Sequence, residues 1–317
     1  MVPLSQMKKK RLTPSSVIRG VFNRLRVYGQ GIFSTPIKIW YANSSGLRNN
    51  FGEKRKLKRL QNDFLLQGEQ IPAQQSALLS AQSLQHDGYY TLPAYFDRET
   101  LLHLQQDVAQ KIENPKLSIS SPNGATRFLL EPLENVPELG MLLRDEVCAI
   151  LTSYYQCAFR VESVRVWRNY HVPNIDTEKE DKFSNTFHHD NCPVMGLRVF
   201  VLLSDGVTRE TGALRFHDKN TSKNIIRRLG YFHREKLTKS MRQRLINPAT
   251  LSFFEGGLGD VCICNTQECL HAASVPKLGT YRDMLQFEVY PTAGPIKTAD
   301  ELLANVPADK TLLAMRG

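Results

Sequence analysis

The amino-acid sequence predicts an α+β protein whose core is a β-sandwich or jelly roll. Apolar residues recur at helical spacing in the first half of the chain, whereas from residue 159 onward they alternate with a period of two. Some of the later segments, such as 197–203, are apolar on both faces, as expected for a sheet that packs against a second sheet and against helices.

Residues 1–84 are predicted to form a basic arm and linker that is partly disordered. Within residues 16–28, apolar side chains fall at helical spacing between arginines, which is typical of a short basic amphipathic helix. A run of cations follows at 54–59, and a stretch rich in Gln, Ala and Ser continues to Gln85. Residues 1–63 carry 14 Lys and Arg but only two acidic residues.

The globular domain is expected at residues 85–295. It opens with a turn and a short strand at 86–93. Asp97 is a candidate N-cap for a helix that has one apolar face and ends at Asn114. A second helix, again with one apolar side, is predicted over residues 138–155.

Strands separated by Gly, Pro, Asn and Asp turns are predicted after this helix. Their ranges are 159–170, 195–203, 213–216, 251–254, 261–264 and 282–290. The basic insertion 217–250 holds nine Lys and Arg against two acidic residues. We expect its positive field to favour an anionic or carrier-linked small-molecule substrate. A C-terminal tail is expected at 296–317.

Composition excludes several classes of protein. No apolar run approaches the ~20 residues of a membrane-spanning helix, and the start lacks the apolar stretch of a secretory signal. Cys262, Cys264 and Cys269 contain no C-x-x-C pair, so core packing is favoured over a metal site. With six cysteines in no disulfide-like spacing, we expect reduced thiols in a cytoplasmic or organellar compartment and no secretion.

A His-x-Asp pair is the first candidate for chemistry. His188 and Asp190 are two residues apart in an extended segment, so their side chains point to the same side. A facial-triad metal site needs a third ligand from another strand and leaves the opposite coordination positions open. His271 is the best candidate for this ligand, and His217 and His233 are the alternatives.

Arg282 follows His271 by eleven residues and opens a predicted strand. A guanidinium is a planar fork of donors that stays charged, which suits the distal carboxylate of a 2-oxo dicarboxylic acid. If Arg282 points into the barrel, the apolar face that begins at Leu285 must pack outward against helices. Arg198 and Arg215 are the next candidates for the same role.

The sequence from about residue 86 to 291 resembles the phytanoyl-CoA dioxygenase family of 2-oxoglutarate oxygenases. Four segments carry the likeness: 86–93 (HDGYYTLP), 188–190 (HHD), 210–214 (ETGAL) and 259–282, which contains GD, HAAS and Arg282. The family has Asn in place of Thr211, and a PGSH sequence in place of 216–219 (FHDK), so the substrate does not follow from the likeness.

The resemblance implies a double-stranded β-helix (jelly-roll) core flanked by N-terminal helices. It implies Fe(II) held by His188, Asp190 and His271, 2-oxoglutarate held by Arg282, and O2 as the oxidant. Succinate and CO2 are then released while the substrate is hydroxylated. Hydroxylation is favoured over halogenation because halogenating relatives have a small residue at the position of Asp190.

Three further polar residues are candidates to help hold 2-oxoglutarate. Asn169 and Tyr170 lie on the strand before the His-x-Asp pair, and Ser274 follows His271 closely. Each is equally compatible with a turn or capping role.

Two other classes of function are compatible with the sequence. The jelly roll could be a non-catalytic binding module, which failure of Arg282 to enter the cavity would favour. Alternatively, the aromatic and cationic residues of 1–63 could act by contacting an anionic membrane surface or nucleic acid. No nucleic-acid recognition motif is found. We expect membrane contact or organelle targeting over nucleic acid, because the Arg-rich, acid-poor start also resembles a transit segment.

Overall fold

The computed structural model describes residues 52–72, 74–173, 184–190, 195–229 and 246–309, and the single positions 237, 243 and 312. The amphipathic helix predicted at 16–28 and the alternative ligand His233 lie outside these residues. None of the described helices is long and apolar enough to cross a membrane.

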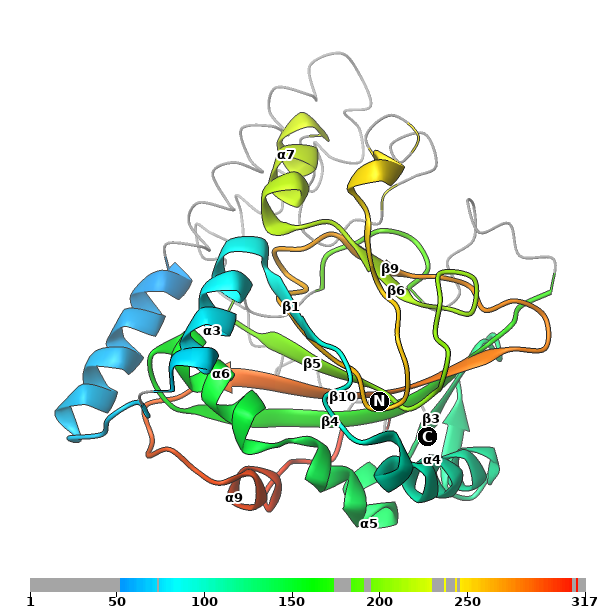
Figure 1. The fold of residues 1–317 in the computed structure, drawn as a ribbon, viewed down its shortest axis with the longest axis horizontal. Coiled ribbons are helices and arrows are strands. Elements are labelled where there is room, and N and C mark those ends of the chain that lie inside the picture. The colour runs from blue at the N-terminus through cyan, green and yellow to red at the C-terminus, as the bar shows by residue number, and fades with distance from the viewer. Residues whose placement is uncertain are drawn as a thin grey trace, which may run out of the picture.

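Two antiparallel sheets form the centre of the molecule (Figure 1). The larger sheet has the order β1-β8-β5-β10-β4-β3-β2, with bounds Tyr89–Leu92, Val261–Cys264, Leu197–Leu202, Tyr281–Pro291, Phe159–Tyr170, Thr126–Leu129 and Ser118–Ser120. The smaller sheet has the order β7-β6-β9, with bounds Ser252–Phe254, Leu214–Phe216 and His271–Ala273. An antiparallel bridge between His188 and His271 extends the smaller sheet beyond β9.

The chain passes back and forth between these two sheets. After β4 in the larger sheet it reaches His188 at the edge of the smaller one, and it then returns to β5. It continues through β6 and β7 in the smaller sheet, β8 in the larger, β9 in the smaller and β10 in the larger. This alternation is a double-stranded β-helix, so the predicted fold class is confirmed.

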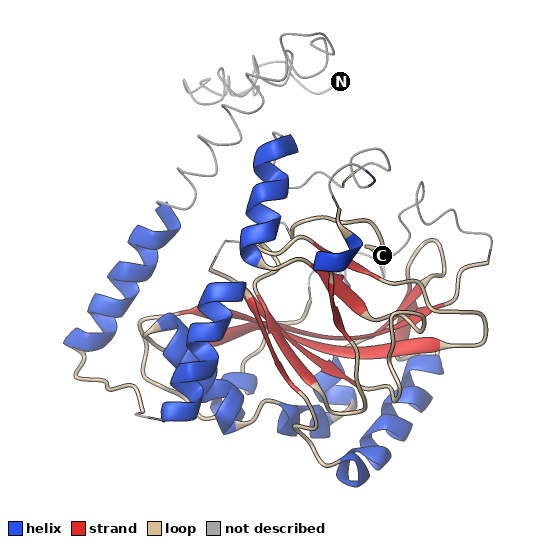
Figure 2. Cartoon of the chain, turned by 45° about the horizontal axis from the view of Figure 1, so that its top comes forward, coloured by secondary structure: helices blue, strands red, loops and turns tan. Residues whose placement is uncertain are grey.

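Helices cover the outer face of the larger sheet, where the main core lies (Figures 1 and 2). They are α3 (Gln75–Asp87), α4 (Arg98–Glu113), α5 (Pro132–Asn135), α6 (Asp145–Tyr155) and α9 (Ala299–Leu303). Leu285, Phe287 and Val289 of β10 are buried in this core, as strand parity predicted. The helix α7 (Lys219–Leu229) lies on the smaller sheet's side instead, and Ile225 packs with Leu270 there.

The space between the two sheets holds a second apolar cluster. Phe200, Cys262 and Met284 enter it from the larger sheet, and Leu214 and Phe216 enter it from the smaller one. The three cysteines Cys262, Cys264 and Cys269 are all buried in this cluster, which agrees with the prediction of core packing.

The first predicted helix is observed with its predicted cap. Asp97 accepts a hydrogen bond from the Thr100 backbone N–H at 3.0 Å, and α4 ends at Glu113 before Asn114. The second predicted helix is broken instead into a 3-10 helix, Pro137–Leu142, and α6. Arg144 is extended between them, and α6 restarts at Asp145 with acidic residues in its first turn, where the helix dipole favours them.

The prediction of a linker before Gln85 is wrong, because residues 52–66 and α3 are helices that pack on the core. Phe64 is fully buried, and Gln61 Nε2 donates a hydrogen bond to the Tyr155 carbonyl at 2.8 Å. The Ala and Ser residues that suggested a linker form the buried side of α3, where small side chains allow close packing.

We expect Phe64→Ala to destabilise the protein by about 3–5 kcal/mol, because it opens a cavity in a closely packed core. Leu66→Ala, at a side chain that is 85% exposed on the same helix, is the matched control and should change stability by less than about 0.5 kcal/mol. Urea unfolding of both variants measures the difference. Equal stabilities would show that residues 52–66 are not part of the folded core.

Candidate metal centre

Three side chains from distant parts of the chain converge between the two sheets. The ligand atoms of His188, Asp190 and His271 all lie within 4.8 Å of one another. The Asp190 Oδ1 atom is 3.7 Å from His188 Nε2 and 3.5 Å from His271 Nε2. No other group of three His, Cys, Asp or Glu side chains with this geometry occurs in the described part of the chain.

Backbone carbonyls orient both imidazole rings. His188 Nδ1 lies 2.8 Å from the Thr186 carbonyl oxygen, and His271 Nδ1 lies 3.1 Å from that of Cys269. Because a carbonyl only accepts, each Nδ1 carries a proton and donates it, so a neutral ring has its free lone pair on Nε2. This arrangement is the usual support of a histidine that binds a metal ion.

The Asp190 carboxylate is also held on one side. Its Oδ2 accepts a hydrogen bond from the buried Thr266 hydroxyl at 2.7 Å and lies 3.6 Å from Arg198 Nε. Burial alone would raise the pKa of Asp190, but His271 and His188 outweigh this effect and hold the pKa well below its usual value. The carboxylate is therefore ionised, with Oδ1 directed to the two histidines.

Arg198 links the metal ligands to a second carboxylate. Its Nη1 lies 2.8 Å from Glu288 Oε1, which also accepts a hydrogen bond from the Tyr290 hydroxyl at 2.6 Å. The Arg198 charge is thus shared between Asp190 and Glu288. The Arg198 side chain is therefore poorly placed to hold a further carboxylate, and the structure does not favour Arg198 over Arg282 as a ligand of the co-substrate.

Arg282 points into the space between the sheets and is 3% exposed. Its Nη1 donates to the Gly212 carbonyl and its Nη2 donates to Asn169 Oδ1, but its Nε has no hydrogen-bond partner among the described residues. Burial lowers the pKa of Arg282 to about 10, so the guanidinium is still charged at neutral pH. No acidic side chain pairs with it in the described part of the chain.

The neighbouring acid, Asp283, does not neutralise Arg282, because it lies on the opposite face of β10. Arg168, which faces Asp283 across the two strands, holds both of its carboxylate oxygens, at 2.7 and 2.6 Å. The Tyr170 hydroxyl donates to Glu113 at 2.7 Å on the same outer network. Tyr170 therefore points away from the site.

Asn169 and Ser274, the other candidates to help hold 2-oxoglutarate, differ in their placement. Asn169 is 2% exposed and is held by hydrogen bonds from Trp167 Nε1 and to the Thr126 hydroxyl, so its Oδ1 is fixed beside Arg282. Ser274 is buried and its backbone N–H donates to the Ala213 carbonyl. Its hydroxyl makes no hydrogen bond within the residues that the structure describes.

The alternative ligand His217 lies outside the metal group. It follows β6 by one residue, so it faces the other side of the smaller sheet, where its ring packs against Phe187 with centroids 5.6 Å apart. Its Nδ1 lies 3.2 Å from the Thr250 carbonyl, and burial lowers its pKa. Arg215 shares this outward face and donates to the Asn185 carbonyl at 2.8 Å.

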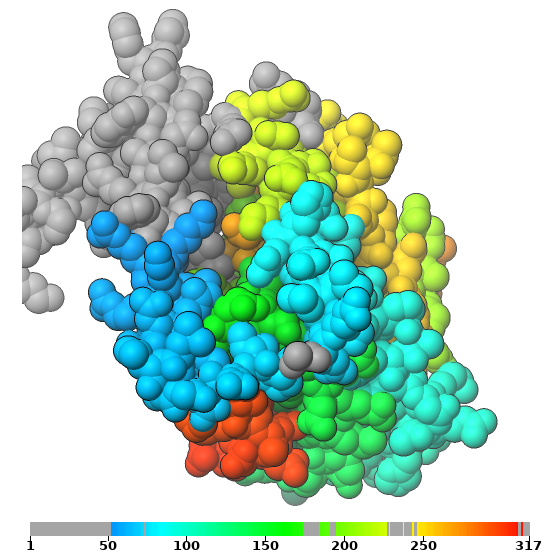
Figure 3. Space-filling model, turned by 60° about the vertical axis from the view of Figure 1, so that its left-hand side comes forward, coloured from blue at the N-terminus to red at the C-terminus, as the bar shows by residue number. Residues whose placement is uncertain are grey.

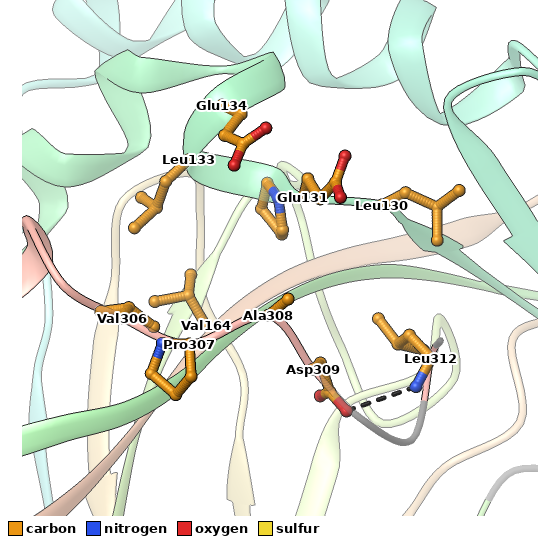
Figure 4. Close-up of a pocket in the computed structure, with 11 residues that line it drawn as sticks. Leu130, Glu131, Leu133, Glu134, Val164, Val306, Pro307, Ala308, Asp309 and Leu312 are labelled. Carbon is orange, nitrogen blue, oxygen red and sulfur yellow. Dashed lines mark hydrogen bonds between the residues drawn. The ribbon is translucent and has the colours of Figure 1, made fainter. Parts of the chain in front are cut away.

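A pocket elsewhere on the molecule does not resemble a catalytic site (Figure 4). Its walls come from the α5 region, from Val164 of β4 and from the segment 306–309 with Leu312. Asp309 accepts a hydrogen bond from the Leu312 backbone N–H there. The metal group described above takes no residue from this pocket.

No family model and no curated protein matches this chain. Similar solved structures include the epimerase SnoN in complex with Fe3+, alpha ketoglutarate and nogalamycin RO, at 14% identity over 74% of this chain and 92% of that one, with a TM-score of 0.49. EctD from S. alaskensis with 2-oxoglutarate and 5-hydroxyectoine has 14% identity, over 68% and 77% of the two chains, and a TM-score of 0.49. HygX from Streptomyces hygroscopicus, with nickel, 2-oxoglutarate and hygromycin B bound, has 16% identity, over 73% and 95%, and a TM-score of 0.47.

Membership of the phytanoyl-CoA dioxygenase family therefore stays a prediction.

Two features of the site were not found from the sequence. Thr266 belongs to no motif, and its role depends on the fold bringing it to Asp190. The Gly212 carbonyl contacts Arg282, and only its place in the Gly-Ala-Leu segment could have drawn attention to it.

We expect Thr266→Val to weaken metal binding about 10- to 100-fold, because Asp190 loses the hydroxyl that orients it. Thr266→Ser keeps the hydroxyl and should bind nearly as wild type. Titration with Co2+ or Fe(II) under anaerobic conditions measures both affinities. If Val and Ser variants bind equally, the Thr266 hydrogen bond does not position the ligand.

Proposed function

We propose that this chain is an Fe(II)- and 2-oxoglutarate-dependent oxygenase that hydroxylates a small organic or lipid-like substrate and releases succinate and CO2. One observation carries the proposal. The interior that contains the His188, Asp190 and His271 group also contains the buried, charged Arg282, which has no acidic partner in the described part of the chain.

The donor set fits Fe(II) better than a structural metal. Two imidazole nitrogens and one carboxylate oxygen with open positions opposite them are typical of non-haem Fe(II) oxygenases. A structural zinc site is normally closed by four protein ligands, often thiolates. The described part of the chain supplies three ligands to this group, and none of them is a thiolate.

The surroundings of Arg282 fit the distal carboxylate of 2-oxoglutarate. Leaving a charge buried without an opposite charge is costly, and a bound carboxylate would offset that cost and occupy the free Nε–H. Arg282 contacts Gly212, and Phe216 pairs with His271. Gly212 precedes β6 and Phe216 ends it, so Arg282 and His271 contact different ends of this segment. A diacid that binds both Arg282 and the metal would lie between them.

When bound, iron with 2-oxoglutarate and O2 supplies the oxidising chemistry. The residues of this chain would hold the metal and the co-substrate in position and exclude water from the site. The Thr186 and Cys269 carbonyls hold the two histidines with Nε2 toward the metal, and Thr266 holds Asp190. Trp167 and Phe200, with ring centroids 6.5 Å apart, help to form an apolar interior that keeps solvent from the site.

Asp190 also supports hydroxylation in preference to halogenation, since its carboxylate occupies the coordination position that a halide would need. The alternative of a non-catalytic jelly-roll module receives less support, because Arg282 enters the interior. A role of Asn169 in holding the co-substrate is proposed from its contact with Arg282, and a role of Ser274 from its position near Ala213 alone.

An anionic substrate is part of the proposal. The described part of the basic insertion includes α7, whose Ser222 and Ile225 are buried while Lys223 and Arg228 are exposed. Arg234, which contributes to the predicted positive field, lies outside the described residues. Succinate release screened over acyl thioesters, amino acids and lipids tests both the activity and the substrate class.

We expect His188→Ala, Asp190→Ala and His271→Ala each to abolish anaerobic Fe(II) binding and succinate release, because each removes one of three ligands. His103→Ala, at an exposed histidine of α4, is the control and should keep both. Iron content and melting temperature are measured for all four. Wild-type iron binding in any ligand variant would remove that residue from the assignment.

We expect Arg282→Ala to raise the 2-oxoglutarate concentration needed for turnover more than tenfold, since losing the partner of a buried carboxylate costs about 2–5 kcal/mol. Fe(II) affinity should be unchanged, because Arg282 is not a metal ligand. Arg215→Ala, on the outward face of β6, should leave the 2-oxoglutarate dependence as in wild type. If instead the Arg215 variant shows the shift and the Arg282 variant does not, the assignment moves to Arg215.

A further inference from the structure

Helix 52–66 presents a strongly basic face to solvent. At 100° per residue, one arc of the helix collects the positions opposite the buried Phe64 and the partly buried Leu57 and Leu60. The cations on this arc are Lys54, Arg55, Lys58 and Arg59, and all four are exposed. The two acidic residues of the helix, Glu53 and Asp63, are only partly exposed and lie outside this arc.

The same arc ends in exposed leucines. Leu65 is 64% exposed and Leu66 is 85% exposed, and both follow the cations by one to three helical turns. Across the connection 67–74, Leu78 and Leu79 at the start of α3 are 45% and 57% exposed. Single exposed leucines are ordinary, but two pairs that flank one connection beside a basic face form a candidate contact surface.

Helix 52–66 and α3 reach the surface on the same face of the molecule (Figure 3). The sequence that enters this helix adds to its charge, because residues 1–51 contain nine Lys and Arg and no Asp or Glu. A partner that covers this surface must therefore carry negative charge and offer an apolar layer to the leucines.

Helix 52–66 adjoins the end of the barrel that holds the partners of the metal ligands through Lys56, which lies outside the basic arc. Lys56 of helix 52–66 lines a pocket together with Glu288 and Tyr290. Glu288 is paired to Arg198, and Arg198 contacts Asp190.

We propose that helix 52–66 and the start of α3 form a docking surface for an anionic lipid membrane. Cations on a helix face with leucines at one end suit the boundary between charged headgroups and acyl chains. Nucleic acid would use the cations but would leave the leucines in water. The leucines therefore favour lipid and make the nucleic-acid alternative an outcome of the test. The surface is independent of the proposed oxygenase activity.

The test uses the full chain and sedimentation with vesicles of phosphatidylcholine alone or mixed with phosphatidylserine. Wild type should bind the anionic vesicles, with lower affinity at high salt. Combined Lys54→Gln, Lys58→Gln and Arg59→Gln should weaken binding about tenfold or more. Combined Leu65→Ser and Leu66→Ser should weaken it about tenfold, since two apolar anchors are lost.

Matched controls separate this surface from charge or apolar exposure in general. They are Leu278→Ser, at a leucine that is 81% exposed elsewhere, and combined Lys116→Gln, Lys277→Gln and Lys297→Gln at other exposed sites. Both should bind as wild type, and all variants should keep the wild-type melting temperature. The proposal is overturned if wild type does not bind anionic vesicles, or if the Leu65 and Leu66 variant binds them as wild type does. It is also overturned if single-stranded DNA competes with the vesicles and loses affinity only in the lysine and arginine variant.

Discussion

The site depends on a pair of backbone hydrogen bonds between His188 and His271. Each residue donates its N–H to the carbonyl of the other, at 3.0 and 3.1 Å, and this bridge joins two positions that lie 83 residues apart in the chain. Because the bridge fixes the backbone, the two rings lie with centroids 4.4 Å apart. Asp190 is held nearby through its own backbone N–H, which donates to the Thr266 carbonyl at 3.1 Å. Backbone hydrogen bonds of this kind restrict the ligand residues, which lowers the entropic cost of holding a metal.

Strand parity separates two arginines into different roles. On facing strands β4 and β10, Arg282 and Asn169 occupy the interior face, and Arg168 and Asp283 occupy the outer face one residue away. The outer pair is mutually neutralised, whereas the interior arginine contacts only uncharged oxygens among the described residues. Had the register slipped by one residue, Asp283 would have entered the interior and the anion-binding character of the cavity would have been lost.

The sequence was most informative where one periodicity extends over many residues. The bounds of β4 and β8 and the cap of α4 were predicted correctly because alternation or an apolar stripe is unbroken there. The strands β2, β3 and β9 were missed because their sequences, SIS, TRFL and HAA, contain polar or small residues and no apolar run. The helix at 52–66 was missed because charge dominates its composition, although Phe64 anchors it. For the site, spacing predicted the ligands, but the contacts of Thr266 and Gly212 depend on strands that are distant in sequence.

The position of β10 has a consequence for how the chain folds during synthesis. This strand lies between β4 and β5 in the larger sheet, yet it is the last strand to be made. The sheet therefore cannot close until residue 291 has left the ribosome, and until then β5, whose residues are apolar except for Arg198, has an unpaired edge. Long-range pairing of this kind folds slowly and is exposed to aggregation. Helices α3, α4 and α6 are synthesised before β5. Their apolar faces can pack against the incomplete sheet until β10 is available.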